Sequence, residues 1–430
     1  MTLPATLRAL RYRNFQLFFS GQSISLIGTW MQNVAQAWLV YRLTGSAVLL
    51  GSVSFAGQIP VFLMSPLGGI VADRFRRHRV VIATQAASML LAFALAALTL
   101  TGLVRIWHIF VLSALLGVVN SFDIPARQAF IVDMVSREDL INAIALNSSM
   151  FNASRVVGPA VAGILVASVG EGWCFFANAA SYLAVIAGLL LMKVQHHRAV
   201  NQPGSPLAEV IEGFRFVMRS TPIHHLMILL GILSVTGMPF AVLMPIFADQ
   251  ILHGGARGLG VLMGASGVGA LAGALLLASR ESVRGLGRWV AISAAAFGAS
   301  LIAFAISRSF WLSCALLLPT GFAMMVEMGS SNTLIQTMSP DHLRGRVMSV
   351  YSMMFMGMAP IGALLAGVAA ARFGAPATVA GGGVICILGA AVFGFRLPGL
   401  RAEARRLIAA AQMAGGDPPQ EATGGSLVLK

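Results

Sequence analysis

The sequence predicts an all-α membrane protein built from two related halves, and three observations support this. Of its 430 residues, 57% are hydrophobic and only 10% are charged, and a water-soluble domain does not carry so large an apolar share on its surface. Apolar runs of about twenty residues, long enough to span a bilayer, occur twelve times. A polar pattern around residue 123 returns about two hundred residues later, as in transporters with internal repeats.

Short loops that contain glycine, proline or basic residues separate the twelve runs. We expect membrane helices at 14–41, 46–72, 80–101, 106–126, 140–168, 173–193, 224–248, 257–279, 288–307, 310–334, 346–370 and 375–396. They divide into a first bundle over residues 14–193 and a second over 224–397. A linker, 194–223, joins them and includes the amphipathic pattern LAEVIEGFRFVMRS. Residues 1–13 form a short N-terminal segment, and the tail at 398–430 is expected to be disordered.

Basic residues are distributed unevenly about these spans. Loops on the side of the two termini hold 23 of the 29 lysines and arginines, whereas the opposite loops hold five. Because basic loops remain in the cytoplasm, we expect both termini to be cytoplasmic, in a bacterial-type inner (plasma) membrane. The basic cytoplasmic loops of this orientation account for the net charge of +14. The sequence contains no patch of interleaved basic and aromatic residues that would predict nucleic-acid binding.

The residue types that carry most enzyme chemistry are sparse or scattered. Cys174, Cys314 and Cys386 each lie in an apolar run without metal-ligand spacing, and the histidines form no metal pattern. No nucleophile elbow, phosphate-binding loop with lysine or HExxH motif occurs. We therefore expect no catalytic site, metal or cofactor, and an energy source other than ATP.

The first span carries polar residues at three-to-four-residue spacing, which places them along one face of a helix. These residues are Gln22, Ser25, Thr29, Gln32, Asn33 and Gln36. Two interpretations remain open. Either the stripe lines a substrate cavity, or its side chains form hydrogen bonds to neighbouring helices without contacting a ligand.

The loop between the second and third spans reads GGIVADRFRRHR over residues 68–79. Its glycines allow helices to approach closely, and the carboxylate of Asp73, at a helix end, can meet the positive N-terminus of another helix. Such contacts would latch the cytoplasmic side shut. The expected gate residues are Gly69, Asp73, Arg74 and Arg77. The stretch resembles the loop signature of the major facilitator superfamily, Gly-x-x-x-Asp-Arg-x-Gly-Arg-Arg, except that Arg76 replaces the second glycine.

This resemblance implies the major facilitator fold, in which twelve helices form two pseudo-symmetric six-helix bundles. In that fold the first, fourth, seventh and tenth spans line a central cavity. Methionine usually fills cores, but its flexibility also suits a cavity wall that accepts varied apolar ligands. The candidate cavity residues are Gln22, Thr29, Gln32, Asn33, Gln36, Asn120, Met324 and Met328.

The stretch from Asn120 to Gly163 joins the fourth and fifth spans and narrows the resemblance. Its motif residues are Asp123, Arg127, Asn147, Arg155, Gly158 and Pro159. The stretch is similar to the efflux branch that includes the enterobactin exporter and macrolide efflux proteins, and the likeness covers roughly residues 8 to 397. The Gly-Pro pair resembles the fifth-span motif of proton-coupled antiporters, where it lets the helix bend. Ser113, however, replaces the fourth-span arginine that is common in drug–proton antiporters.

Ionisable side chains inside membrane spans are costly, so each one is a candidate for function. Asp123 and Arg127, at i, i+4 spacing, either neutralise one another or include a proton-coupling carboxylate. Arg155 either pairs with Asp123 or a helix C-terminus, or it lines the substrate cavity.

Glu327 lies near the place of Asp123 in the second copy of the repeat, where Ser339–Leu343 stands in the register of Ser136–Leu140. No arginine stands three or four residues away from it. Burial therefore favours the protonated form of this carboxyl. Glu327, together with Asp123, is the candidate for proton coupling.

These patterns predict a secondary active transporter, not an enzyme. We expect a monomer that exports amphipathic small molecules, drug-like or siderophore-like, by alternating access, and the resemblance implies proton coupling. The alternatives are a lysophospholipid or nutrient facilitator, and uptake by uniport. A non-transporting sensor and a polytopic membrane enzyme are further alternatives, and the latter would need clustered His, Asp or Glu at one membrane face.

Overall fold

The computed structural model describes residues 5–193, 206–280 and 282–414, and every regular element within these ranges is helical. The helices are α1 (Arg13–Thr44), α2 (Ala47–Arg74), α3 (Arg77–Leu100), α4 (Ile106–Met134), α5 (Leu140–Val169), α6 (Glu171–Leu190), α7 (Pro206–Arg219), α8 (Thr221–Ile232), α9 (Phe240–Ile246), α10 (Gly255–Ala278), α11 (Leu286–Ile306), α12 (Phe310–Met338), α13 (Asp341–Ser352), α14 (Met358–Phe373) and α15 (Ala375–Ala414). Short 3-10 segments are η1 (Ala5–Arg11) and η2 (Arg137–Asp139), and π-helical turns are η3 (Leu233–Gly237), η4 (Phe247–Ile251) and η5 (Met353–Gly357).

Eleven helical segments within the described ranges are long and apolar enough to cross a membrane. The remaining predicted span is α1, whose 32 residues reach about 48 Å at the helical rise per residue. Its polar stripe lowers its hydropathy without shortening it. Because α1 packs along α5 and α6, the structure accommodates it as the twelfth span.

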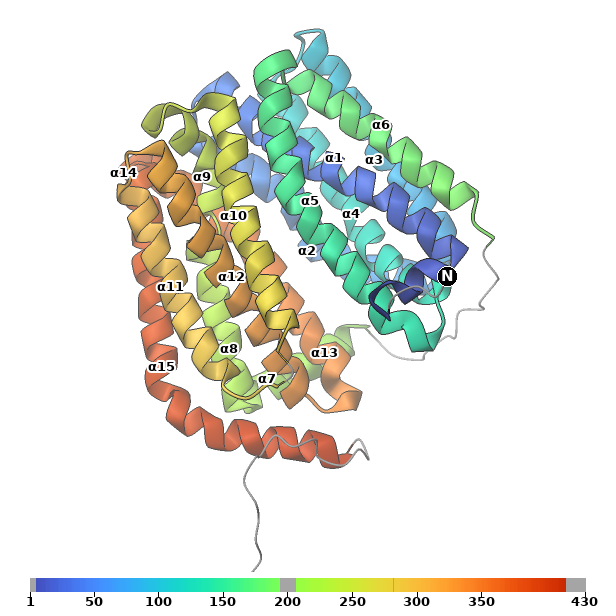
Figure 1. The fold of residues 1–430 in the computed structure, drawn as a ribbon, viewed down its shortest axis with the longest axis vertical. Helices are drawn as coiled ribbons and strands as arrows, with labels where there is room; N and C mark the ends of the chain where they lie inside the picture. The colour runs from blue at the N-terminus through green and yellow to red at the C-terminus, as the bar shows by residue number, and fades with distance from the viewer. Residues whose placement is uncertain (1–4, 194–205, 281, 415–430) are drawn as a thin grey trace, which may run out of the picture.

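The helices form two bundles (Figure 1). The first consists of α1 to α6, in which α2 packs on α4 and both α1 and α3 pack on α6. The second consists of α8–α9, α10, α11, α12, α13–α14 and α15, in which α10 packs on α12 and α11 packs on α15. In Figure 1 the first bundle, blue to green, lies on the right and the second, yellow to red, on the left. The predicted all-α architecture of two related bundles is confirmed.

Two pairs of helices provide most of the contact between the bundles, α2 with α14 and α5 with α10. They are the second span with the eleventh and the fifth span with the eighth. In the duplicated halves the second span corresponds to the eighth, and the fifth corresponds to the eleventh. The α2–α14 pair is therefore the symmetry counterpart of the α5–α10 pair. The interface therefore has the pseudo-twofold symmetry of a duplicated transporter.

Glycines bring both pairs close together at one end. Gly163 of α5 lies against α10, where an added Cβ would be 2.9 Å from the Gly260 Cα. Gly51 of α2 lies against α14, where an added Cβ would be 3.3 Å from the Gly367 Cα. Small residues allow such close approach of helices in membranes. We call this end the far side, and the end where α1 begins and α15 ends the terminal side.

The last helix extends beyond its membrane span. The sequence predicts disorder from residue 398, but α15 continues to Ala414 and crosses the bottom of Figure 1. The segment after Pro398 is rich in alanine, leucine and arginine, which are strong helix formers. The remainder of that tail, 415–430, and linker residues 194–205 lie outside the described residues. Within the linker, α7 occupies the place of the amphipathic pattern.

Candidate functional site

The fourth and tenth spans, α4 and α12, are equivalent helices of 29 residues each. Asp123 and Glu327 are each the eighteenth residue of their helix. One turn later, at i+4, α4 carries Arg127 and α12 carries Ser331. The two carboxyl groups are therefore structural counterparts, and the residue one turn away distinguishes them.

Asp123 is 3% exposed, and donors occupy both of its oxygens. Oδ1 accepts hydrogen bonds from Thr84 Oγ1 at 2.8 Å and from Gln85 Nε2 at 2.9 Å, both on α3. Oδ2 accepts from Arg127 Nε at 3.0 Å, which also makes an ion pair. Charge-assisted hydrogen bonds of this kind stabilise an ionised carboxylate. The network neutralises Asp123 and ties α3 to α4.

Glu327 is fully buried, with 0% exposure, and has far fewer partners. Its Oε1 accepts a hydrogen bond from Ser331 Oγ at 2.9 Å. Its Oε2 is buried and has no hydrogen-bond partner among the described residues. Tyr351 and Cys386 are close enough to interact with it electrostatically, but neither supplies a positive charge. Glu327 forms no ion pair among the described residues, and burying a charged carboxylate without a partner is costly.

Arg155 of α5 lies between the two bundles. Its Nη2 is 4.0 Å from the Met324 sulfur on α12, and its Cζ is 5.9 Å from the centre of the Trp30 ring on α1. It takes part in none of the ion pairs formed by the described residues. Of the two interpretations from sequence, pairing with Asp123 is not observed. Met324 is one turn before Glu327 on α12, so Arg155 contacts the same helix that carries this carboxyl.

Some residues of the polar stripe of α1 are buried against neighbouring helices, and others are accessible. Gln32 Oε1 accepts from Asn178 Nδ2 of α6 at 2.7 Å, and Gln36 Nε2 donates to Ser113 Oγ of α4 at 2.9 Å. Gln22 is 3% exposed, with its carbonyl oxygen unpartnered. These glutamines therefore pack within the first bundle, which fits the interpretation of hydrogen bonds between helices.

Two other stripe residues are more accessible. The Thr29 hydroxyl, half-buried, donates to the Ser25 carbonyl at 3.0 Å, whereas Asn33 is exposed. Asn33 is three residues after Trp30, so both lie on one helix face, and Trp30 contacts Arg155. Trp30 itself packs against α5, where its ring meets that of Phe151.

The Gly-Pro pair of the motif lies where α5 contacts two other helices. Gly158 packs against α1, where an added Cβ would be 3.0 Å from the Ile27 carbonyl oxygen. The carbonyl oxygen of Pro159 lies against Gly260 of α10. The Gly-Pro pair thus allows α5 to pack between α1 and α10. Asn120, Asn147 and Met328 are partly exposed, whereas Met324 is 4% exposed.

The gate residues lie at the terminal end of α2. The Asp73 side chain is 74% exposed and pairs with Arg77 at 3.8 Å. Arg77 is closer to Asp133 of α4, with Nη1 3.1 Å from Oδ1. Arg74 is exposed. An added Cβ at Gly69 would contact nothing within 4 Å, whereas the neighbouring Gly68 packs against the Ser121 backbone and Pro125. The close approach expected at Gly69 thus occurs one residue earlier.

One hydrogen bond between the bundles lies toward the far side. The Tyr41 hydroxyl, near the end of α1, donates to Asp249 Oδ2 at 2.8 Å. Together with the glycine pairs, this contact joins the two bundles on the far side. The exposed Asp73 lies at the opposite, terminal end.

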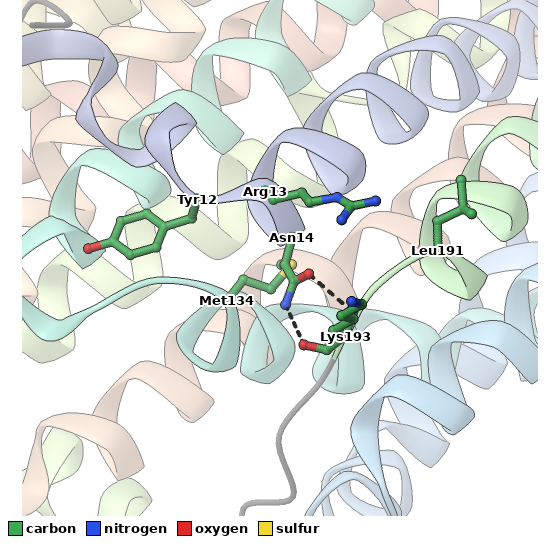
Figure 2. A pocket seen from close by; sticks show the side chains of 6 residues that line it. All are labelled: Tyr12, Arg13, Asn14, Met134, Leu191 and Lys193. Carbon is green, nitrogen blue, oxygen red and sulfur yellow. Dashed lines mark hydrogen bonds between the residues drawn. The ribbon is translucent and has the colours of Figure 1, made fainter.

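A cavity of about 250 Å³ on the terminal side lies within the first bundle (Figure 2). Asn14, near the start of α1, donates to the Lys193 carbonyl at 3.0 Å and accepts from the Lys193 amide at 3.3 Å. Figure 2 shows these two hydrogen bonds beside Met134 and Leu191. The contacts tie the beginning of α1 to the segment after α6. They belong to one bundle and do not form a path between the two.

Several of these neighbours are not singled out by the sequence analysis. The adjacent polar pair Thr84 and Gln85 in an apolar span is a signal that points to a buried partner, as is Ser331 at i+4 from Glu327. Trp30 carries no such signal, since aromatic residues are common in membrane helices. Among the described residues, no group of three or more His, Cys, Asp or Glu is arranged to hold a metal ion.

Comparison with known proteins gives a consistent result. A family model described as "Transmembrane secretion effector" matches residues 4–418. The staphyloferrin A transporter of Staphylococcus aureus is 27% identical over 378 residues, which cover 86% of this chain and 93% of that protein. The multidrug efflux pump Tap of Mycolicibacterium fortuitum is 27% identical, and the match covers 80% of this chain and 86% of that protein. The enterobactin exporter EntS of Escherichia coli O1:K1 / APEC is 26% identical, covering 82% and 84%.

Solved structures share the fold at low sequence identity. The nucleoside transporter NupG, in its D323A mutant, superposes with a TM-score of 0.71 at 14% identity, covering 89% of this chain and 98% of that one. A POT family transporter in complex with 5-aminolevulinic acid superposes with a TM-score of 0.74 at 10% identity, and the match covers 90% of this chain and 97% of that one. A bacterial homologue of the human lysosomal transporter Spinster superposes with a TM-score of 0.62 at 14% identity, and the match covers 98% of this chain and 100% of that one.

Proposed function

Because the chain belongs to the transmembrane secretion effector family of major facilitator transporters, we propose that it exports amphipathic small molecules by proton-driven alternating access. Its relatives include proteins named as an enterobactin exporter and a multidrug efflux pump, which supports export as the direction. The terminal side is assigned to the cytoplasm from the distribution of basic residues. The structure then corresponds to a conformation that is closed toward the outside. We assign the transporter to the inner membrane, as a monomer.

One observation carries this proposal, namely the position of Arg155, whose Nη2 lies 4.0 Å from the sulfur of Met324, a residue one turn before Glu327 on α12. A guanidinium remains protonated in proteins, and a cation without a counter-charge in a membrane span is costly. An acidic group on the substrate removes that cost when it binds Arg155. Trp30 and Met324 provide apolar contact for the rest of an amphipathic molecule.

Substrate and proton are coupled because both compete for the Oε2 atom of Glu327. Glu327 Oε2 is buried and has no partner among the described residues, so a rearrangement of the bundles that exposes it would let it accept a hydrogen bond from a hydroxyl or amide of the substrate. That hydrogen bond is strongest when the carboxylate is ionised, and protonation removes the acceptor charge. Substrate and proton therefore bind in alternation, which is the requirement for exchange across the membrane. Asp123 is the weaker candidate because three donors already occupy it.

Asp73 acts as a latch in the opposite conformation. The α2–α14 contact places the terminal end of α2 opposite the eleventh span, whose first helix, α13, begins at Asp341. When the bundles close on the terminal side, Asp73 approaches the N-terminus of α13, where backbone N–H groups stabilise a carboxylate. In the present conformation the latch is released, and Asp73 is exposed.

Accumulation assays in cells that express the chain test the proposal. Macrolides, fluorescent dyes and siderophores are supplied with and without a protonophore. We expect lower retention of at least one acidic amphipathic compound, loss of the effect with the protonophore, and loss with Arg155→Gln. Arg137→Gln, an exposed arginine on the terminal side, is the matched control.

Other outcomes favour the other functions. Higher retention on expression indicates a facilitator or uptake by uniport. Export that persists after the proton gradient collapses removes proton coupling from the account. If no compound changes its retention, export is rejected.

A further inference from the structure

The second bundle contains a cavity of about 600 Å³ on the terminal side, away from the interface between the bundles. Its wall is formed by the start of α8, the loop before α11, the end of α12 and the last part of α15. The volume falls within the range of about 300–1,000 Å³ that is typical of small-molecule pockets. None of the residues assigned to transport above lines it.

The inner wall of this cavity is apolar. Leu226, Met338, Phe393 and Leu397 line it, and all four are at least nine-tenths buried. A hydrocarbon chain gains free energy from contact with such a surface, in proportion to the apolar area that it buries. A free inorganic anion would gain nothing from this part of the wall.

The rim of the cavity is basic. Arg284 and Arg288 come from the loop and helix start of α11, and Arg401 and Arg405 come from α15. Within the described ranges, none of the four forms an ion pair. Guanidinium groups bind phosphate oxygens well because their donors form a planar fork. The rim therefore matches a phosphate that carries a negative charge.

The segment of α15 that supplies half of this rim is attached to the bundle. Glu403 Oε1 accepts a hydrogen bond from the Thr221 amide at 3.3 Å, and Arg396 lies 2.6 Å from His225 Nε2. The helix thus crosses the terminal end of the second bundle (Figure 1), at the level where a membrane surface meets the protein. Basic residues at that level attract anionic lipids.

From the apolar wall and the basic rim together, we infer that this cavity is a binding site for one anionic phospholipid. The acyl chains occupy the wall of Leu226, Phe393 and their neighbours, and the phosphate binds the arginines. The lipid joins α15 to the loop between α10 and α11. That loop links the eighth and ninth spans, so it is the counterpart of the gate loop between the second and third. The inference does not depend on which substrate the transporter carries.

Native mass spectrometry of the purified full chain tests this site. The protein is incubated with equal amounts of phosphatidylglycerol and phosphatidylcholine, and the bound lipid is measured. We expect a clear preference for phosphatidylglycerol. Each basic residue near a membrane surface contributes about 1 kcal/mol toward anionic lipid, so Arg401→Gln with Arg405→Gln lowers the phosphatidylglycerol affinity about thirtyfold. Arg284→Gln with Arg288→Gln gives a similar loss from a different part of the wall.

Matched variants separate this site from general charge effects. Arg76 and Arg79 are exposed on the terminal side of the first bundle, and their double Gln variant should leave the affinity unchanged. Ala404→Trp places bulk in the cavity without altering charge and should also reduce lipid binding. A normal thermal unfolding midpoint shows that each variant is folded.

Three results would overturn the inference. Equal retention of the two lipids by the wild-type chain excludes an anionic lipid site. An equal loss in the Arg76 and Arg79 control assigns the effect to surface charge. Displacement of lipid by inorganic phosphate alone, with no effect of Ala404→Trp, identifies a phosphate site instead.

Discussion

Asp123 and Glu327 occupy the same position in equivalent helices, yet their surroundings differ. Asp123 has two donors from α3 and an arginine one turn away, whereas Glu327 has one serine hydroxyl. A carboxylate with a full set of donors is stabilised in its ionised form, and one without a counter-charge is not. This asymmetry is the basis of our proposal that Asp123 holds helices together and that Glu327 exchanges a proton.

Replacing Glu327 with glutamine should remove the proton dependence of transport. The amide retains the size of the side chain and an acceptor for Ser331, but it cannot be protonated or ionised. We expect transport rates in proteoliposomes that no longer respond to an imposed pH difference, with thermal stability close to that of the wild type. Ser331→Ala is the control, since it changes a hydrogen bond and keeps the carboxyl. An unchanged pH response in Glu327→Gln would remove this residue from the mechanism.

Replacing Asp123 with asparagine should instead destabilise the protein. The substitution leaves Arg127 without its ion-pair partner at a site where the two side chains are 22% and 4% exposed. Breaking a buried pair on one side costs roughly 3 kcal/mol. The measurement is a double-mutant cycle in unfolding free energy with Arg127→Gln, which should recover part of the loss. If the losses of the two single variants add up in the double variant, the ion pair contributes little to stability.

The residues that could be predicted are those with a local pattern. The i, i+4 spacing of Asp123 and Arg127 predicts their ion pair, and the absence of an arginine near Glu327 predicts its weaker neutralisation. The donors Thr84 and Gln85 come from another helix, and the contact of Arg155 with Met324 crosses between bundles. Such partners depend on the rotation of each helix in the bundle, which a single sequence does not specify.

At the scale of helices, four glycines form the far-side contact in two equivalent pairs. Gly51 with Gly367 and Gly163 with Gly260 bring backbones together where an added Cβ would require a shift. The sequence contains 46 glycines, so these four cannot be recognised from sequence alone. Hydropathy predicts the positions of the spans well, because each must cross the apolar layer. It does not predict the extension of α15, which follows from helix propensity.

Gly260→Leu should prevent the far side from closing fully. An added Cβ would lie 2.6 Å from the Pro159 carbonyl oxygen, and overpacking typically costs about 2 kcal/mol. This cost changes the ratio of the two conformations about thirtyfold. Spin labels at Leu43 and Trp311, both exposed, should report a larger far-side separation. Gly264→Ala, whose nearest neighbour is 3.9 Å away, is the control, and a distance unchanged in Gly260→Leu would contradict the role of this contact.

Asp73→Asn should slow transport without affecting the stability of the conformation described here. The carboxylate is largely exposed, and its 3.8 Å pair with Arg77 is of the type that contributes about 0–1 kcal/mol. Its larger role belongs to the conformation closed on the terminal side. We expect an unchanged unfolding midpoint and a reduced transport rate. A transport rate equal to that of the wild type would remove the latch from the cycle.

At the scale of the whole molecule, the duplicated halves have the pseudo-twofold symmetry on which the proposed alternating access depends, and we propose that the differences between them provide direction and coupling. The repeated pattern in the sequence predicts the two bundles and their equivalence. It does not predict which side is closed, because both conformations arise from the same helices and differ by small shifts at their interface. In the proposed cycle, ligands and protons set the small free-energy difference between such states.

Transport into inside-out membrane vesicles tests the central claim most directly. In these vesicles the cytoplasmic side faces outward, so export appears as uptake of an acidic amphipathic substrate into the lumen. With the lumen made acidic, the account predicts rapid accumulation that a protonophore abolishes and that Glu327→Gln no longer shows. Accumulation at the same rate with and without the pH difference, in the wild type and in Glu327→Gln alike, would contradict proton-driven export.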